Sequence, residues 1–382
     1  MGFPFWLRIK RSAFISTFFL KYYLGLVWNL ATPKNLTYYW GFGRFLGMVI
    51  VVQIGSGVIL AFYYVRGILA WESVVDITRD VNLGWAVRLI HGNVASFVFV
   101  VLFIHFFRGL FFGGFYLKFS WIRGWAIIRF TIIAAFFGYV LPWGQISFWG
   151  ATVIINLLRV LPMGSTLVIW LWGGFYVSSF TCRFFFAIHF IVPFLILGLA
   201  VIHLFLLHIT GSSVPGGVRF SGALKLKFGH FYFYKDIVNL SFFWVILLSM
   251  LLWPDWFVDP VNFIVSDLSR SPLHIQPEWY FLHLYAVLRS IPNKLGGLVG
   301  FVLALIVLLI LVLCQANQRL SQYKFYNVFF WLFLYSNIVL LWLGIQGVEI
   351  PYVAIGQAIT ISYFGLIFIL IWRDLATRSL HR

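Results

Sequence analysis

The sequence predicts an all-α integral membrane protein with eight transmembrane helices, and three observations support this prediction. Of the 382 residues, 62% are hydrophobic and only 10% are charged, whereas soluble domains are about 25% charged. The apolar residues form runs long enough to cross a bilayer, which requires about 20 residues per helix. Aromatic residues make up 21% of the chain, as expected for aromatic belts at the two membrane surfaces.

The eight predicted spans occupy residues 41–64, 84–112, 121–141, 184–208, 237–253, 296–314, 327–343 and 351–372. We expect surface helices at the N-terminus (10–30), between the third and fourth spans (145–170), and in the loop between the fifth and sixth spans. Residues 1–215 are predicted to form a four-helix bundle, and residues 216–382 a second helical region.

Charge distribution predicts the orientation of the spans. Acidic residues collect in the loops after the first, fifth and seventh spans, and most lysines and arginines lie at the opposite ends. An excess of basic residues marks the cytoplasm-equivalent side, here called the negative side, so we expect both termini there. The net charge is +17, but the basic residues lie between apolar spans and do not form a basic patch. This distribution argues against a nucleic-acid partner.

The chain has two cysteines, Cys182 and Cys314, which are far apart in apolar surroundings. There is no CxxC or CxxCH motif. The sequence therefore excludes a c-type haem attachment and an iron–sulfur cluster held by cysteines of this chain.

Four histidines form two pairs with the same internal step. His91 and His105 are fourteen residues apart, as are His189 and His203. Fourteen residues are about 21 Å of helix, with both side chains on one face. The second and fourth spans run parallel, so His91 faces His189 and His105 faces His203. This register predicts two stacked metal centres, each a bis-histidine haem, although intramembrane histidines also serve as helix-packing hydrogen bonders.

Glycines repeat the step of fourteen on the other two helices of the bundle. The first span contains Gly43 and Gly57, and the third contains Gly124 and Gly138. A porphyrin between four helices requires flanking helices without side chains at ring height, and glycine permits that approach. The alternative is ordinary small-residue packing between membrane helices.

Two arginines lie one turn from a histidine on the same helical face, Arg88 before His91 and Arg108 after His105. Each is the expected partner of an anionic haem propionate. The alternative is an arginine that extends to the membrane surface.

The chain resembles cytochrome b of the ubiquinol–cytochrome c reductases, from WGFG at 40–43 to the last span. The motifs that carry the resemblance are GYVLPWGQ at 138–145, SFWGAT at 147–152, PEWY at 277–280 and RSIPNK at 289–294. The resemblance implies two b-type haems on the four histidines, with ubiquinol and ubiquinone as substrates. It also implies a dimeric complex with a Rieske iron–sulfur protein, a c-type cytochrome and further subunits. The related plastoquinol family splits this protein into two chains and usually has fifteen residues between the second pair of histidines. The unsplit chain and the step of fourteen here favour the respiratory family.

A quinol oxidation site on the positive side needs a base beside an apolar pocket. Glu278 follows Pro277 in a loop on that side, and the resemblance makes it the proton acceptor. Tyr280, Tyr139 and Gly150 correspond to walls of the same pocket. From its local sequence alone, Glu278 is equally well read as a solvated loop carboxylate.

A quinone reduction site on the negative side must take up protons, which suits a histidine and an acid near the two carbonyls. His208 ends the fourth span, and Lys235 and Asp236 stand before the fifth. The resemblance assigns His208, Asp236 and a polar residue at the place of Ser212 to that site, with Lys235 beside them. The alternative is a helix-end histidine and an N-cap aspartate.

Three residues depart from the family pattern. Arg183 is one residue further from His189 than the family arginine, so no role is carried over to it. Arg44 is an unusual charge beside Gly43, open to contact with a propionate, quinone or lipid headgroup. His283 either tunes the exit of protons from the oxidation pocket or is a packing residue.

We expect a dihaem subunit that couples quinol oxidation at one surface to quinone reduction at the other. A proton-relay transporter would show inverted repeats, and a ferric reductase or NADPH oxidase a nucleotide-binding fingerprint; neither is found. High apolarity and the lack of a transit peptide favour an organelle-encoded protein of the mitochondrial inner membrane, both termini on the matrix side. A bacterial plasma membrane is the alternative.

Overall fold

The computed structural model describes residue 25 and residues 28–212, 214, 225–313 and 324–379. Within these residues, eight helices are long and apolar enough to cross a membrane, which confirms the predicted all-α membrane fold. They are α2 (Phe42–Tyr63), α4 (Gly84–Phe111), α5 (Lys118–Val140), α8 (Ser179–Thr210), α9 (Phe228–Leu252), α11 (Lys294–Ile310), α12 (Lys324–Leu343) and α13 (Tyr352–Ser379). Nearly all of the predicted N-terminal helix falls outside the described residues.

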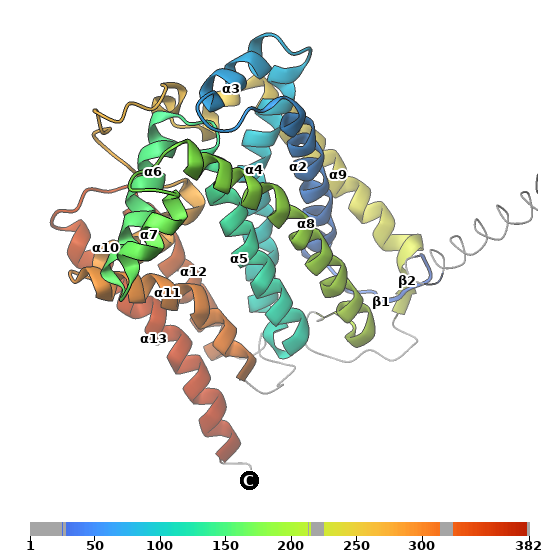
Figure 1. Cartoon of the computed structure of the whole chain (residues 1–382). Helices are drawn as coiled ribbons and strands as arrows, with labels where there is room; N and C mark the ends of the chain where they lie inside the picture. The colour runs from blue at the N-terminus through green and yellow to red at the C-terminus, as the bar shows by residue number, and fades with distance from the viewer. Residues whose placement is uncertain (1–24, 26–27, 213, 215–224, 314–323, 380–382) are drawn as a thin grey trace, which may run out of the picture.

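The first four spans pack as a bundle, with α2 against α4 and α5 against α8 along their lengths (Figure 1). Phe45 and Val49 of α2 meet Val94 and Val98 of α4 in its core. Helix α9 packs on the outside of α2 and α4, where Phe243 enters the same core. The bundle is therefore closed along one side by the fifth span.

Helix α9 begins at Phe228, well before the predicted start at 237. The hydropathy of the sequence misses this part because it contains Lys235 and Asp236. The helix extends N-terminal to the apolar stretch because Tyr232 and Lys235 donate hydrogen bonds to the carbonyl oxygens of Pro33 and Leu36. Asp236 consequently lies inside the helix, and the N-cap alternative is wrong, since Lys227 occupies that position.

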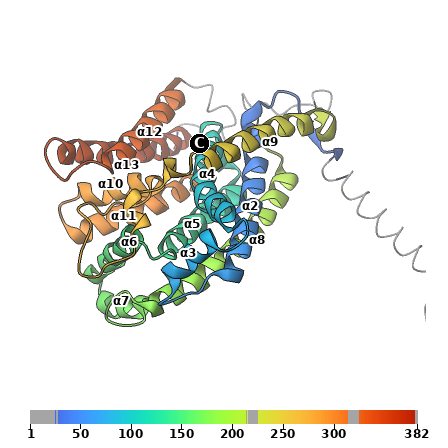
Figure 2. The ribbon, with the colours of Figure 1, turned by 90° about the horizontal axis from the view of Figure 1, so that it is seen from above.

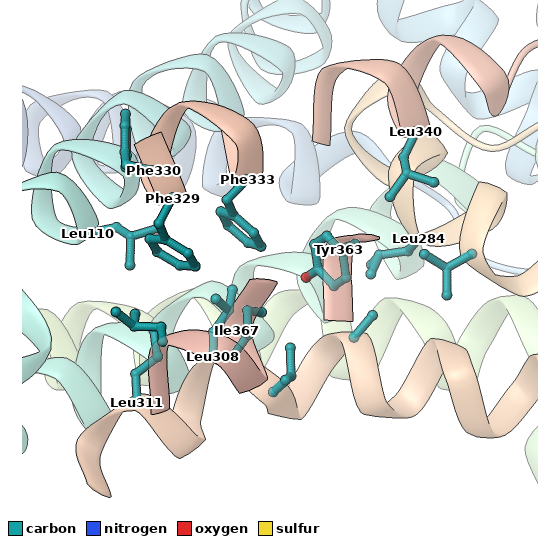
Figure 3. Close-up of a cluster of buried hydrophobic side chains, with 14 of the residues drawn as sticks. Leu110, Leu284, Leu308, Leu311, Phe329, Phe330, Phe333, Leu340, Tyr363 and Ile367 are labelled. Atoms are coloured by element: carbon teal, nitrogen blue, oxygen red, sulfur yellow. The ribbon is translucent and has the colours of Figure 1, made fainter. Parts of the chain in front are cut away.

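The last three spans form a second core beside the bundle (Figure 2). Figure 3 shows Phe333 of α12 and Tyr363 of α13 at its centre, with ring centroids 5.1 Å apart. Helix α10 (Leu282–Ser290), expected as a surface helix, buries Leu284 and Val287 in this core. The predicted surface position is wrong because residues three and four apart, such as Leu284 and Val287, share one helix face that is buried here.

The shorter elements lie at the ends of the spans. Helices α6 (Gln145–Asn156), η4 (Leu157–Val160) and α7 (Gly164–Trp172) confirm the predicted helices between the third and fourth spans. Helix α3 (Ala70–Arg79) was not predicted, although Ala70, Ser73 and Ile77 form a buried stripe along it. Strands β1 (Ala31–Pro33) and β2 (Lys225–Lys227) pair antiparallel. The remaining 3-10 turns are η2 (Tyr38–Gly41), η3 (Gly114–Tyr116), η6 (Pro254–Phe257), η7 (Pro260–Phe263), η8 (Trp279–Phe281) and η9 (Leu311–Leu313).

Candidate functional site

The structure brings the four histidines together in the predicted register. The ring centroids of His91 and His189 are 6.1 Å apart, and those of His105 and His203 are 6.5 Å apart. A bond between a metal ion and an imidazole nitrogen is about 2 Å long, so two rings on opposite sides of one metal have centroids about 6 Å apart. Each pair is therefore close enough for both imidazoles to bind one metal ion.

The four glycines that share the step of fourteen each face one of these histidines. A side-chain carbon added at any of them would lie within 3.4 Å of an imidazole Cε1 atom, and at three of them within 3.0 Å. The pairs and distances are Gly43–His105 (2.9 Å), Gly57–His91 (2.8 Å), Gly124–His203 (3.4 Å) and Gly138–His189 (2.4 Å). Helices α2 and α5 therefore leave room for the four imidazole rings only because these positions lack a side chain.

Three of the imidazoles have a hydrogen-bond partner at Nδ1, which for His105 is Nη2 of Arg108 at 3.4 Å. Nδ1 of His91 lies 3.0 Å from the Ser56 hydroxyl, and Nδ1 of His189 lies 2.7 Å from the carbonyl oxygen of Ala134. When Nδ1–H donates to the carbonyl oxygen, Nε2 of His189 keeps its lone pair for a metal. Such partners set the tautomer and orientation of a ligating histidine.

Arg88 and Arg108 lie at opposite ends of the histidine array on α4. Arg88 donates to the Thr78 hydroxyl at 3.0 Å, and the Arg108 guanidinium lies over the Trp40 ring, 5.1 Å from its centroid. Within the described part of the chain, no carboxylate forms an ion pair with either. Both charges are thus available to an anionic group bound between the helices.

Glu278 stands at the start of η8, at the His91/His189 end of the bundle. Its carboxyl group is hydrogen bonded with the Tyr139 hydroxyl. Burial raises the pKa of Glu278 to about 7; the Tyr139 hydrogen bond opposes this rise and the nearby Asp259 charge adds to it. A carboxyl group with this pKa exchanges protons readily at neutral pH.

The surroundings of Glu278 are aromatic and rigid. Tyr280 is buried and stacks on Phe99 of α4, with ring centroids 3.9 Å apart and planes 5° from parallel. The indole of Trp279 donates to the Ser96 hydroxyl at 3.2 Å. These contacts attach the loop to α4, so that Glu278 keeps a fixed position relative to His91.

The start of helix α6 is bound to the same loop between the fifth and sixth spans. Gly144 forms a β-bridge with Val265. The Gln145 side chain donates to the Arg270 carbonyl oxygen at 2.5 Å and accepts from the Asp267 amide at 2.7 Å. Gly150 lies further along α6, where an added carbon would meet nothing within 4 Å. Its predicted place in the pocket wall stays a prediction.

His283 and Arg183 have clearer surroundings than the sequence alone provides. The His283 ring contacts Phe103 edge-on, with centroids 6.1 Å apart, and burial, together with the Arg129 charge, lowers its pKa to about 4. A neutral ring among aromatic side chains favours packing over proton exit. Arg183 lies over Phe180, 5.7 Å from the ring centroid, on the first turn of α8.

A cavity of about 260 Å³ lies between the first turns of α2 and α9, near the His105/His203 end. Arg44 and Asp236 line it and form an ion pair through two hydrogen bonds of 2.5 and 2.9 Å. The other lining residues are Gly41, Phe45, Met48, Phe228, Phe233 and Asn239. Sequence reasoning missed most of these, although those of α2 share one helical face at steps of three and four.

The other residues predicted for this end are less closely grouped. Lys235 donates to the Leu36 carbonyl oxygen at 3.0 Å and does not line the cavity. Ser212 is exposed. In the described residues, no hydrogen bond or ion pair joins His208 to Asp236. The structure therefore places Asp236, but not His208, at the cavity.

Known proteins match this chain in sequence and in architecture. Residues 27–211 match the family described as cytochrome b/b6/petB, and residues 265–364 match cytochrome b(C-terminal)/b6/petD. The cytochrome b of Bugula neritina is 43% identical over 347 residues, which cover 90% of this chain and 94% of that protein. A solved hyperthermophilic respiratory complex III contains a chain that superposes with a TM-score of 0.88 at 28% identity, covering 93% of this chain and 96% of that one.

Proposed function

The chain belongs to the cytochrome b family, and on this premise we propose that it is the haem-binding, quinol-oxidising subunit of a respiratory complex III. The observation that carries the proposal is the match between two histidine pairs and four glycines that leave the imidazoles space. Coordination by two histidines suits an iron whose remaining ligands come from a porphyrin.

The residues present fit two b-type haems. His91 with His189 would hold one haem iron and His105 with His203 the other, and Arg88 and Arg108 would meet the propionates, one at each end. When bound, the two haems supply one-electron transfer between the ends of the bundle. The chain itself fixes the imidazoles through Ser56 and the Ala134 carbonyl oxygen and excludes water with the apolar core of α2 and α4.

Quinol oxidation takes place beside Glu278. Oxidation of a quinol to the quinone releases two electrons and two protons, and the Glu278 carboxylate accepts a proton from a quinol hydroxyl group. Its raised pKa suits this exchange at neutral pH. Tyr139 orients the carboxylate, Tyr280 forms the aromatic wall, and Gly150 leaves open space on α6.

Quinone reduction takes place at the cavity that Asp236 lines, at the opposite end of the bundle. Reduction adds two electrons and two protons to the quinone. Asp236 and Arg44 provide the polar contacts of the cavity, and His208, in the last turn of α8, supplies protons from the nearby surface. Ser212 and Lys235 belong to the polar rim at the same end.

The electrons of one quinol leave in two directions. One goes to a high-potential Rieske iron–sulfur partner and then to a c-type cytochrome, and the other goes toward the opposite end of the bundle. The similarity to a chain of a respiratory complex III supports assembly with other subunits, and we propose that this assembly is homodimeric and contains these two partners. We place the complex in the mitochondrial inner membrane, with both termini on the matrix side. Residues 1–215 would form the haem-binding unit, and residues 216–382 would contribute to both quinone sites.

Spectroscopy and turnover of the purified complex test this function. The expected result is two b-type bands in reduced-minus-oxidised spectra, together with cytochrome c reduction that depends on added quinol. A proton-relay transporter would show no b-type absorption. A dihaem reductase of another class would show the bands without quinol oxidation.

A further inference from the structure

The ion pair between Arg44 and Asp236 occupies one acceptor site on each oxygen of the carboxylate. Nε and Nη2 of Arg44 donate to the two different oxygens of Asp236, at 2.5 and 2.9 Å. This two-point contact is the strong, oriented form of an arginine–carboxylate pair. Both carboxylate oxygens of Asp236 therefore already have a donor before any ligand enters the cavity.

The guanidinium, by contrast, keeps donors to spare. Arginine has five N–H groups, and Asp236 accepts from two of them. The Arg44 side chain is 41% exposed, against 21% for Asp236, so more of the arginine is accessible. Its Cζ atom lies 4.6 Å from the centroid of the Phe228 ring, so the guanidinium packs against an aromatic ring of the cavity lining.

A second donor without a partner lines the same cavity. The side-chain nitrogen of Asn239 is buried and, within the described residues, has no hydrogen-bond partner. A carbon added at Gly41 would lie 2.3 Å from this nitrogen. Glycine at 41 thus lets the Asn239 amide lie directly against the backbone at the cavity wall, where a ligand oxygen can satisfy its nitrogen.

The remaining walls suit an aromatic ring. Phe45, Met48, Phe228 and Phe233 supply apolar surface, and Met adapts to irregular aromatic ligands. A cavity of about 260 Å³ is near the lower end of the range for small-molecule sites. An apolar slot with hydrogen-bond donors and one cation matches a planar ligand with carbonyl oxygens.

We propose that Arg44 binds a carbonyl oxygen of the quinone in this cavity, with Asn239 as a second donor and Asp236 as the positioning residue that holds the guanidinium. This inference rests on the proposed function of the cavity as the quinone reduction site. The cation of Arg44 stabilises the oxygen that gains negative charge when electrons from the quinol oxidised near Glu278 arrive. Protons for the reduced quinone come from the aqueous surface at this end.

Equilibrium binding of decyl-ubiquinone to the purified complex tests the assignment. The wild-type complex is expected to bind two per chain. Arg44→Gln should weaken one of the two sites about tenfold or more, because a hydrogen bond from a charged group is lost, and should lower the kcat of quinone reduction. Arg44→Lys keeps the charge without the two-point contact, so it should recover part of kcat.

The order of effects separates the positioning residue from the binding residue. Asn239→Leu should raise the Kd of the same site about fivefold with little change in kcat. Asp236→Asn keeps an oxygen that still accepts from Arg44, so its effect should be smaller than that of Arg44→Gln. A larger loss of affinity or turnover in Asp236→Asn than in Arg44→Gln would overturn the proposal.

Controls distinguish the possible failures. Arg123→Gln should bind like the wild type, because Arg123 donates to the Phe119 carbonyl oxygen and does not line the cavity. Unchanged b-type spectra confirm assembly of each variant. If the affinities of both decyl-ubiquinone sites are unchanged in Arg44→Gln, the role of Arg44 is contradicted, but the proposed function of the cavity is not. A wild-type complex that binds fewer than two decyl-ubiquinones contradicts the proposed function of the cavity as well.

Discussion

A side-chain carbon added at Gly138 would lie 2.4 Å from Cε1 of His189. Real Cβ atoms do not approach other atoms this closely, so the α5 backbone and the α8 imidazole can share this level of the bundle only with glycine at 138. The same relationship recurs at a wider 3.4 Å between Gly124 and His203, one step of fourteen away. Helix α5 is therefore fitted to both histidine pairs.

Substitution of these glycines should remove haem from one centre at a time. Gly138→Ala should lower haem occupancy at the His91/His189 centre to below half, because either the imidazole or the helix must move. Gly124→Ala, at 3.4 Å, should have a smaller effect on the other centre. Haem content and reduced-minus-oxidised spectra measure both. Gly55→Ala is the control, since an added carbon there meets nothing within 4 Å.

Loss of the Glu278 carboxylate should slow quinol oxidation about a hundredfold, within the usual range for a general base. Only the ionised form accepts a proton, and the pKa of Glu278 is raised to about 7. The wild-type rate should therefore fall as the pH drops through about 7, and Glu278→Gln should lose this dependence. The control is Glu72→Gln, an exposed acid in α3. An unchanged rate in Glu278→Gln would rule out its role as the base.

Removal of the Tyr139 hydroxyl should move the pH profile. Its hydrogen bond lowers the pKa of Glu278 against the effect of burial, so Tyr139→Phe should raise that pKa further. The midpoint of the rate–pH profile should shift to higher pH by on the order of one unit, since a hydrogen bond is worth about 1 kcal/mol. A shift to lower pH would contradict this assignment. Steady-state rates of quinol oxidation between pH 5 and 9 measure this midpoint.

Arg88 and Arg108 should each affect only the nearer haem centre. Removing a positive charge beside a bound haem favours the oxidised form, so Arg108→Gln should lower the midpoint potential of the His105/His203 centre. The expected size is roughly 60 mV, equivalent to a tenfold change in a one-electron equilibrium. Arg88→Gln should do the same at the other centre. Redox titrations that found both centres shifted equally by one substitution would argue against propionate contacts.

The haem register could be predicted from the sequence because it depends on one periodicity. Side chains fourteen residues apart lie on the same face of a helix. Between two parallel helices with this step, His91 can face only His189 when His105 faces His203. The glycines share this step of fourteen, and the structure shows which histidine each of them faces. The structure agrees with these pairings because the geometry of a straight helix determines them.

The quinone-reduction end could not be predicted equally well. Hydropathy ended the fifth span at the first polar residues, and so Asp236 was placed before α9 rather than within it. The partner of Asp236 is Arg44, 192 positions away in the sequence, and no local pattern specifies a contact of that length. Asn239 was missed because a single amide in an apolar helix carries no periodic signal.

The most direct test of the account is a haem count on purified protein combined with removal of one ligand. The wild-type chain should carry two b-type haems. His189→Leu should carry one, with the spectrum and midpoint potential of the His105/His203 centre retained. A wild-type chain with fewer than two haems, or a His189→Leu variant that keeps both, would contradict the claim that these histidine pairs hold two haems between parallel helices.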